Sequence, residues 1–456
     1  MTGISVRRRQ RAFFISLAAV VVLSFCPRAA ASAGDLDVTF SGDGWIRAAG
    51  AVSDGNAYFP AGAEDVALAP DGKLLAVSEL TDSASAWWFG AFRYTASGGL
   101  DSSFGEGGWV DTDLGSFDFP HTVAVQADGK VFVGGVSDCS GYVGCATLVR
   151  YTAAGELDPT FGGGDGIVKT KFANCGCIIN DLVIQPDGRI VAAGWRYAYR
   201  ADAMNQAVMT VTRYLPNGEL DMSFSRDGKL SVDLGFGNDY AYTAALQKDG
   251  KIVLGGRGTP NWWTRGDDLA FVRLRRNGTL DPTFSGDGKR TVNFSGTRRE
   301  AAFDLALQSD GKILGVGTSS VDHQQRPWLE VVRLRPDGRL DPSFSGDGKL
   351  QTRGGAYAAD GLGIAQGLDG RIVVSGQAFA DYHLSDSQWL VLGYTASGAP
   401  DLSFGTSGII RGYPPGPGPY ASGDNWAGPI VVQPNGKLVV AGKISGYQSL
   451  ARYLAN

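Results

Sequence analysis

Short apolar stretches separated by polar, Gly-rich turns recur along the chain. In one copy, Tyr242–Gln247 is apolar-rich, the turn Lys248–Lys251 follows, and Ile252–Gly256 is apolar again. An Asp-Gly pair between two such stretches predicts a β-hairpin, because glycine accepts a positive φ at little steric cost. Leu269–Leu274 alternates as a further strand, and we expect Lys289–Phe294 to be the first strand of the next unit. Each unit therefore predicts four strands.

Two phrases alternate and set the period of this pattern. One is L-D-x-[ST]-F followed by a Gly-rich turn, and the other is a [DN]-G-[KR] turn between apolar stretches. Starts of the first phrase lie 57 to 64 residues apart. Its aspartates are Asp37, Asp101, Asp158, Asp221, Asp281, Asp341 and Asp401. Four strands in about 60 residues are typical of a β-propeller blade.

The two ends of the array complement each other. Leu36–Phe40 has no preceding strand, and the C-terminal segment Ala451–Leu454 stops where the next L-D phrase would be due. Joining the ends completes a seventh unit and removes exposed sheet edges. We predict an all-β fold, a seven-bladed β-propeller of four-stranded antiparallel blades closed by its N- and C-terminal segments. An open solenoid is the alternative, but solenoid periods are usually shorter and need capping units.

The first 33 residues have the pattern of an export signal. Four arginines precede the apolar stretch Ala12–Phe25, and Ala31-Ser32-Ala33 resembles a cleavage site. A membrane anchor is the alternative, but this stretch is short for a span. We therefore expect a signal peptide at 1–33, one propeller domain at 34–456, and a periplasmic or extracellular location.

Charge narrows the range of partners. Removal of residues 1–33 deletes five arginines and no acid, so the net charge of −5 becomes −10. No basic cluster remains, which argues against nucleic acid, and no other apolar stretch is long enough to cross a bilayer. We expect a soluble monomer whose partner is a glycan or an envelope or extracellular protein.

The repeat phrases resemble a known family. Arg273–Phe284 and Gln247–Val253 are similar to the delta-60 repeat of bacterial secreted and surface proteins, and the similarity extends over residues 36 to 454. The resemblance implies a propeller-like array outside the cytoplasm, and it carries no established catalytic residue or ligand. The sixth unit departs from the pattern with Gly393 for arginine and Pro400 for leucine, which leaves the geometry of that blade open.

An arginine stands eight residues before most of the L-D aspartates. A catalytic centre needs one positioned set of groups, whereas a pair copied in nearly every unit is expected to tie a strand to the following turn through charge-assisted hydrogen bonds. We predict a structural role for these residues, which are Arg93, Arg150, Arg213, Arg273, Arg333 and Arg452.

Four cysteines follow the signal segment: Cys139, Cys145, Cys175 and Cys177. They fall in loops that an up-and-down blade places on one face of the ring, so neighbouring blades can bring them together. Export favours two disulfides over a Cys₄ zinc site, and the pairing stays open. The Asp-containing Gly-rich turns could offer oxygens to Ca²⁺, but they lack an EF-hand pattern, so we expect no metal and no cofactor.

Loops that differ from unit to unit gather on one face, where binding residues are expected. Their aromatic and histidine residues suit a glycan or a peptide. H-E-x-x-H, G-x-S-x-G and phosphate-binding motifs are missing from the sequence. We favour a non-catalytic binding module over a propeller lyase or hydrolase with a central pocket, or a structural envelope protein. The candidate ligand-binding residues are Trp262, Trp263, Trp195, Tyr197, His323 and His383.

Overall fold

Strands and tight turns make up the part of the chain that the structure describes. This computed structural model describes residues 32–48, 51–53, 56–81, 87–115, 117–138, 144–172, 176–198, 206–235, 237–259, 266–294, 299–321, 325–381, 387–412 and 425–455. Within these ranges thirty strands form seven antiparallel sheets and no helix occurs. The predicted seven-bladed, all-β propeller is therefore confirmed.

The innermost strands are β4 (Asp65–Leu68), β8 (Phe119–Val125), β12 (Cys177–Ile184), β16 (Tyr240–Leu246), β20 (Arg299–Leu307), β24 (Ala358–Gln366) and β28 (Trp426–Val432). The second strands are β5 (Leu74–Thr81), β9 (Val131–Asp138), β13 (Ile190–Ala198), β17 (Ile252–Gly258), β21 (Ile313–Val321), β25 (Ile372–Phe379) and β29 (Leu438–Ile444). The third strands are β6 (Trp87–Tyr94), β10 (Gly144–Tyr151), β14 (Gln206–Tyr214), β18 (Asp268–Leu274), β22 (Gln325–Leu334), β26 (Ser387–Tyr394) and β30 (Tyr447–Tyr453). The outermost strands are β7 (Trp109–Thr112), β11 (Ile167–Thr170), β15 (Lys229–Val232), β19 (Lys289–Val292), β23 (Lys349–Thr352), β27 (Ile409–Arg411) and β1 (Trp45–Arg47).

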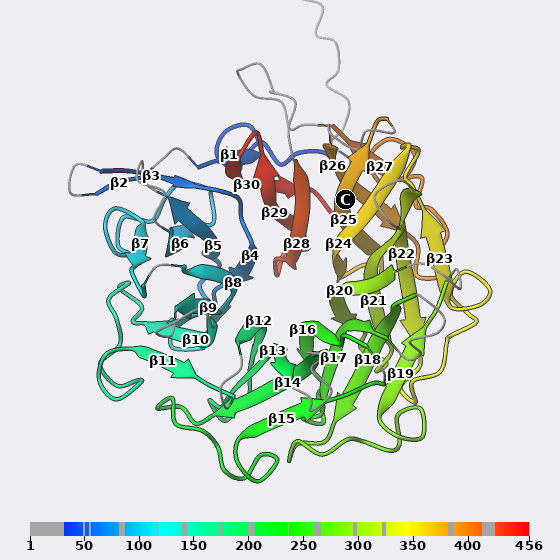
Figure 1. Cartoon of the computed structure of the whole chain (residues 1–456). Helices are drawn as coiled ribbons and strands as arrows, with labels where there is room; N and C mark the ends of the chain where they lie inside the picture. The colour runs from blue at the N-terminus through cyan, green and yellow to red at the C-terminus, as the bar shows by residue number, and fades with distance from the viewer. Residues whose placement is uncertain are drawn as a thin grey trace, which may run out of the picture. The chain divides into compact units, whose positions relative to one another are not determined.

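The seven sheets form a ring around a central axis that the innermost strands surround (Figure 1). We number the blades from the one that begins with β4, so that blade 7 contains β28 to β30. The N-terminal β1 completes blade 7 by pairing with β30, with Ile46 opposite Leu450. Figure 1 shows this blue strand beside the red C-terminal strands. The ring is thus closed by the two ends of the chain, as predicted.

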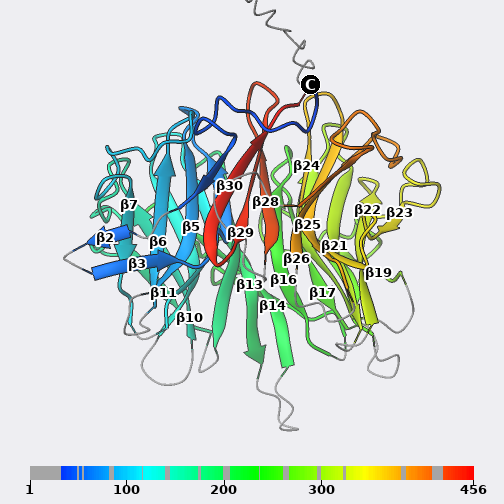
Figure 2. The same ribbon diagram turned by 90° about the horizontal axis from the view of Figure 1, so that it is seen from above.

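One strand assignment from the sequence was wrong. Lys289–Val292 pairs with β18, with Leu269 opposite Val292, and is the outer edge of blade 4 rather than the first strand of the next unit. The sequence could not distinguish the two because consecutive strands are neighbours along the chain in either scheme. A hairpin of β2 (Ala51–Ser53) and β3 (Asn56–Pro60) also joins blade 1 through β5 and projects from its side (Figure 2).

Seven hydrophobic clusters hold the ring together, and each lies between two adjacent blades. The cluster between blades 3 and 4, for example, joins Val191 and Val211 to Leu254 and Val272. The phenylalanine that ends each L-D-x-[ST]-F phrase is fully buried, which explains why the phrase is copied. These residues are Phe40, Phe104, Phe161, Phe224, Phe284, Phe344 and Phe404.

Candidate functional site

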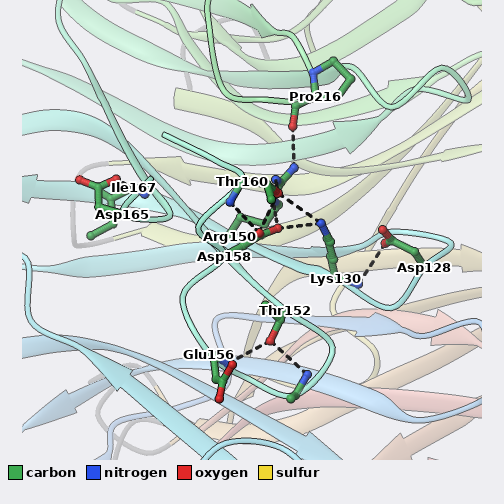
Figure 3. Close-up of polar contacts among 11 residues, drawn as sticks. Asp128, Lys130, Arg150, Thr152, Glu156, Asp158, Thr160, Asp165, Ile167 and Pro216 are labelled. Atoms are coloured by element: carbon green, nitrogen blue, oxygen red, sulfur yellow. Dashed lines mark hydrogen bonds and ion pairs between the residues drawn. The ribbon is translucent and has the colours of Figure 1, made fainter. Parts of the chain in front are cut away.

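The repeated arginine and aspartate form a buried tie within each blade, shown for blade 2 in Figure 3. Arg150 Nε lies 2.7 Å from Asp158 Oδ2, and Arg150 Nη2 donates to Thr160 Oγ1 at 2.7 Å. Lys130 of the Asp-Gly-Lys turn reaches the same carboxylate at 2.9 Å. Burial opposes ionisation of Asp158, but the hydrogen bonds from Lys130 and Thr160 and the charge of Arg150 hold its pKa well below the usual range.

The same arginine also links its blade to the next one. Arg150 Nη1 donates to the carbonyl oxygen of Pro216 in blade 3 at 2.5 Å (Figure 3). Equivalent bonds join every pair of neighbouring blades around the ring. They run from Arg93 to Ala153, Arg213 to Arg276, Arg273 to Pro336, Arg333 to Ala396, Arg371 to Ala455 and Arg452 to Ala96. This arrangement stabilises the ring, and its sevenfold repetition is unsuited to a single reaction centre.

The predicted ligand-binding residues divide into two groups. Trp262, Trp263, His323 and His383 lie outside the described residues. Trp195 and Tyr197 are described, and their rings meet edge to face with centroids 5.1 Å apart. Both stand at the end of β13, on the face that carries the connections between second and third strands, which we call the loop face. The opposite face, with the [DN]-G-[KR] turns, is the turn face.

Three further aromatic rings extend this pair across two more blades. Trp195 contacts Tyr240 of blade 4 with centroids 5.0 Å apart, and Tyr240 stacks on Tyr242 at 5.9 Å. Tyr242 in turn contacts Phe303 of blade 5 at 5.2 Å. We call these five residues the aromatic row. Tyr197 is its most accessible member, with 44% of its surface exposed, and the other four are partly exposed.

The row was partly missed in the sequence because Tyr240, Tyr242 and Phe303 lie on strands rather than in variable loops. Their strands β16 and β20 are innermost strands, whose alternate side chains face the ring axis or a neighbouring blade. The sequence signal that could have identified the row is a pair of aromatic residues at alternate positions of one strand, such as Tyr240 and Tyr242.

A charged group borders the row on blade 4. The guanidinium carbon of Arg257 lies 4.5 Å from the centroid of the Tyr240 ring, and Arg257 Nε lies 3.3 Å from Asp267 Oδ2. Thr259 Oγ1 donates to Asp267 Oδ1 at 2.5 Å, so this carboxylate is held on both sides. Arg299 Nε of blade 5 lies 4.0 Å from Asp267 Oδ2, the oxygen that also contacts Arg257, and 66% of the Arg299 side chain is exposed.

Three aspartates on the innermost strands also link neighbouring blades, and we call Asp65, Asp181 and Asp304 the carboxylate belt. Each accepts a backbone N–H from the following blade. The bonds are Val123 N to Asp65 at 2.8 Å, Ala244 N to Asp181 at 2.6 Å and Ile364 N to Asp304 at 2.8 Å. Thr122 Oγ1 lies between two members, 3.0 Å from Asp65 Oδ2 and 3.3 Å from Asp181 Oδ1. The belt thus joins blades 1, 3 and 5 to their successors.

Burial raises the pKa of every belt aspartate. The pKa of Asp65 rises to about 8, with the nearby charge of Asp181 as the second cause. The pKa of Asp304 rises to about 7 and that of Asp181 to about 6, and in all three the hydrogen bonds listed above oppose the rise. Raised pKa values of this kind occur in buried structural networks as well as in catalytic sites, so they do not by themselves indicate catalysis.

Two more titratable groups lie beside the belt, His121 on the innermost strand β8 and Glu64 directly before the innermost strand β4. Burial lowers the pKa of His121 to about 4, although a hydrogen bond with Asn180 opposes the shift. Glu64 reaches solvent, yet desolvation by the surrounding blades and the charge of Glu79 raise its pKa to about 7. His121 precedes belt-bound Thr122 directly, and Glu64 precedes Asp65. The sequence did not single out Glu64.

The cysteines are only partly described. Cys139 and Cys175 lie outside the described residues. Cys145 and Cys177 are buried on neighbouring blades, and the Ala146 N–H donates to Cys177 Sγ at 3.3 Å. The structure therefore brings the start of β10 and the start of β12 together across the interface of blades 2 and 3, while the pairing of all four cysteines stays a prediction.

In the described parts of the chain, histidine, cysteine and acidic side chains form no group of three that could hold a metal ion. Across the same residues there is no helix long and apolar enough to cross a membrane.

Four segments of the chain match a family described as a domain of unknown function (DUF5122) beta-propeller, at residues 126–161, 185–224, 247–284 and 308–344. Each segment runs from the glutamine before an Asp-Gly turn to the phenylalanine of the next L-D-x-[ST]-F phrase. The match supports a propeller repeat family and does not extend to the delta-60 name. No curated protein matches the chain.

Several solved structures are similar at low identity. A protein of unknown function from Dyadobacter fermentans DSM 18053 is 12% identical, with 73% of this chain and 93% of that one covered and a TM-score of 0.45. A polysaccharide lyase PL25 ulvan lyase is 12% identical, with 88% and 95% covered and a TM-score of 0.47. A glucose dehydrogenase is 14% identical, with 72% and 99% covered and a TM-score of 0.37. At these values no activity or ligand is transferred to the chain.

Proposed function

We propose that the chain is an exported, non-catalytic binding module of the delta-60 type whose loop face holds a glycan. The observation that carries the proposal is the aromatic row, in which side chains from three blades meet next to a charged group. Aromatic rings offer sugars flat apolar surfaces, while neighbouring polar groups fix their orientation. Binding residues are often carried by a rigid scaffold, and here the propeller ring holds the aromatic row on its loop face.

The remaining charged constellations favour binding over catalysis. Arginines and aspartates of the repeat are committed to ties between blades, and the belt aspartates accept backbone hydrogen bonds. A catalytic site requires groups that are free to bind and transform a substrate. We accordingly place no catalytic residue in the repeat clusters. Trp262, Trp263, His323 and His383, which lie outside the described residues, stay proposed ligand-binding residues of the loop face.

A glycan-binding screen of the full chain tests the proposal. Tyr197→Ala removes an exposed ring of the row, and we expect it to weaken binding to the retained glycan about tenfold, since a stacked ring contributes roughly 1–3 kcal/mol by analogy with base stacking. Leu402→Ala is the control because Leu402 is 72% exposed and lies in an L-D-x-[ST]-F phrase on the turn face. A Trp262→Ala/Trp263→Ala variant tests the loop candidates. Retention of no glycan in the screen would exclude this function.

A propeller lyase or hydrolase is the second candidate, and Glu64 favours it. A solvent-accessible carboxyl group with a pKa of about 7 is suited to general acid–base catalysis near neutral pH. In that case the protein depolymerises a glycan that it binds, and Glu64→Gln abolishes turnover while binding persists. Absence of chain shortening by size-exclusion analysis of each bound glycan would eliminate the enzyme and leave the binding module.

A further inference from the structure

Arginine side chains stack on aromatic rings along the loop face beyond the aromatic row. In blade 5, the guanidinium carbon of Arg353 lies 3.7 Å from the centroid of a Trp328 ring. The guanidinium carbon of Arg326 lies 3.9 Å from the centroid of Tyr357, at the entrance to blade 6. With Arg257 over Tyr240, three such pairs therefore stand on consecutive blades. Stacking fixes the guanidinium plane, so fewer side-chain rotamers are lost when an anion binds.

All of these arginines stand at the loop-face ends of their strands. Arg326 lies at the start of β22, and Arg353 directly follows the end of β23. Arg257 is the penultimate residue of β17, and Arg299 is the first residue of β20. Antiparallel neighbours in a blade reverse direction at each connection, which brings these ends to one face. The arginines consequently share a face with the aromatic row.

Two arginines of this face contact the same acidic side chain. Arg257 and Arg299 converge on one carboxylate, that of Asp267, and Asp267 is mostly buried and also accepts from Thr259. Two cations therefore share one anion. Arg299 leaves most of its side chain in solvent, and Arg326 is exposed as well. On the turn face, by contrast, Lys73 and Arg93 are matched by Asp71 and Asp101.

We infer that the glycan held at this face is an acidic polysaccharide, whose carboxylate or sulfate groups bind Arg299 and Arg326 while its sugar rings lie against the aromatic row. The inference rests on the proposed function and adds the ligand's chemical class. Guanidinium groups match the geometry of carboxylate and sulfate oxygens and bind them through paired hydrogen bonds.

The experiment compares three soluble polymers of matched length by calorimetry with the full chain: polygalacturonate, dextran sulfate and neutral dextran. We expect one or both anionic polymers to bind at least tenfold more tightly than dextran, with an affinity that falls as salt is added. The two anionic polymers separate a carboxylate ligand from a sulfate ligand. Arg299→Ala/Arg326→Ala is expected to weaken anionic binding about tenfold, as for loss of charged hydrogen bonds.

Arg339→Ala is the matched control, because Arg339 is 77% exposed and lies in an Asp-Gly turn on the turn face. It should leave all affinities unchanged. Binding of dextran as tight as that of the anionic polymers would overturn the inference and leave the proposed function intact. Failure of every glycan to bind would overturn both. Anionic binding that the double variant leaves unchanged, or that Arg339→Ala weakens equally, would also overturn the assignment.

Discussion

Arg371 donates from Nε to Asp401 Oδ2 at 2.5 Å and so supplies the charge that blade 6 lacks at Gly393. In the other blades the partner of the L-D aspartate comes from the third strand, whereas Arg371 comes from the Asp-Gly-Arg turn. It reproduces the remaining contacts as well, with Nη2 donating to Ser403 Oγ and Nη1 to the carbonyl of Ala455 in blade 7. The geometry of this blade is therefore conserved by a different residue.

Removal of Arg371 should destabilise the ring. Arg371→Ala leaves Asp401 without its main counter-charge and breaks the link to blade 7, and we expect the free energy of unfolding to fall by about 3 kcal/mol. Arg333→Ala in blade 5 provides the comparison, because Arg333 makes the standard set of bonds. Chemical denaturation measures both. If Arg371→Ala were as stable as the wild type, the contacts of Arg371 with Asp401 and Ala455 would not contribute to stability.

Restoring the repeat arginine should not rescue that variant. A Cβ atom at Gly393 would lie 2.6 Å from Phe404 Cγ, so Gly393→Arg in the Arg371→Ala background requires Phe404 to move. Overpacking of this kind costs about 1–3 kcal/mol. We expect the double variant to be less stable than Arg371→Ala in the same denaturation experiment, and recovery of stability would contradict the packing argument.

The bond between Asp37 and Arg452 closes the ring across the whole chain. Arg452 Nε donates to Asp37 Oδ2 at 2.7 Å, and Lys437 Nζ donates to the same oxygen at 2.6 Å. Asp37→Ala should lower the melting temperature and promote aggregation, because loss of the N-terminal strand exposes the edge of β30. Asp158→Ala is the control, because it breaks the equivalent tie within blade 2. We expect it to lower the melting temperature as well, but with less aggregation than Asp37→Ala when both are followed by light scattering.

Stability should be greatest in mildly acidic solution. The folded pKa values of Asp65, Asp304 and Asp181, about 8, 7 and 6, lie above the unfolded value of 3.8. Their contribution is complete below that value and is lost as the pH rises through the folded pKa values. Asp37 and Asp281 have folded pKa values of about 2, so their contribution is present above 3.8 and is lost as the pH falls through about 2.

Calorimetric melting between about pH 3 and pH 9 checks this balance. We expect the melting temperature to decline from mildly acidic to mildly alkaline solution, and Asp65→Asn to reduce the slope of that decline even though it lowers stability overall. A melting temperature that rises steadily across the same range would rule out the belt aspartates as the dominant titrating groups.

Gly363 stands where the innermost strands of blades 1 to 5 carry a belt aspartate or, in blades 2 and 4, Thr122 and Thr243. A Cβ atom there would collide with the carbonyl oxygen of Gly428 in blade 7 and would crowd Ser375 Oγ, which bonds that carbonyl. Gly363→Ala should therefore lower the free energy of unfolding by about 1–3 kcal/mol. Gly99→Ala, where a Cβ would approach Thr95 Oγ1 no closer than 3.7 Å, is the control and should change stability little by the same measurement.

The sequence by itself determined the architecture of this protein, because the period of its apolar stretches and Asp-Gly turns follows directly from strand and turn geometry. It likewise indicated that Arg150 and Asp158 belong together, since they recur at fixed spacing in nearly every unit. It could not determine that Arg371 replaces the arginine missing at Gly393, because the two positions are adjacent only after β25 and β26 pair. Nor could it assemble Trp195, Tyr240 and Phe303, which belong to three units and meet only when the ring brings neighbouring blades into contact. Local spacing fixes what each blade is, whereas contacts between blades depend on how the sheets pack, and the candidate site is made of those contacts.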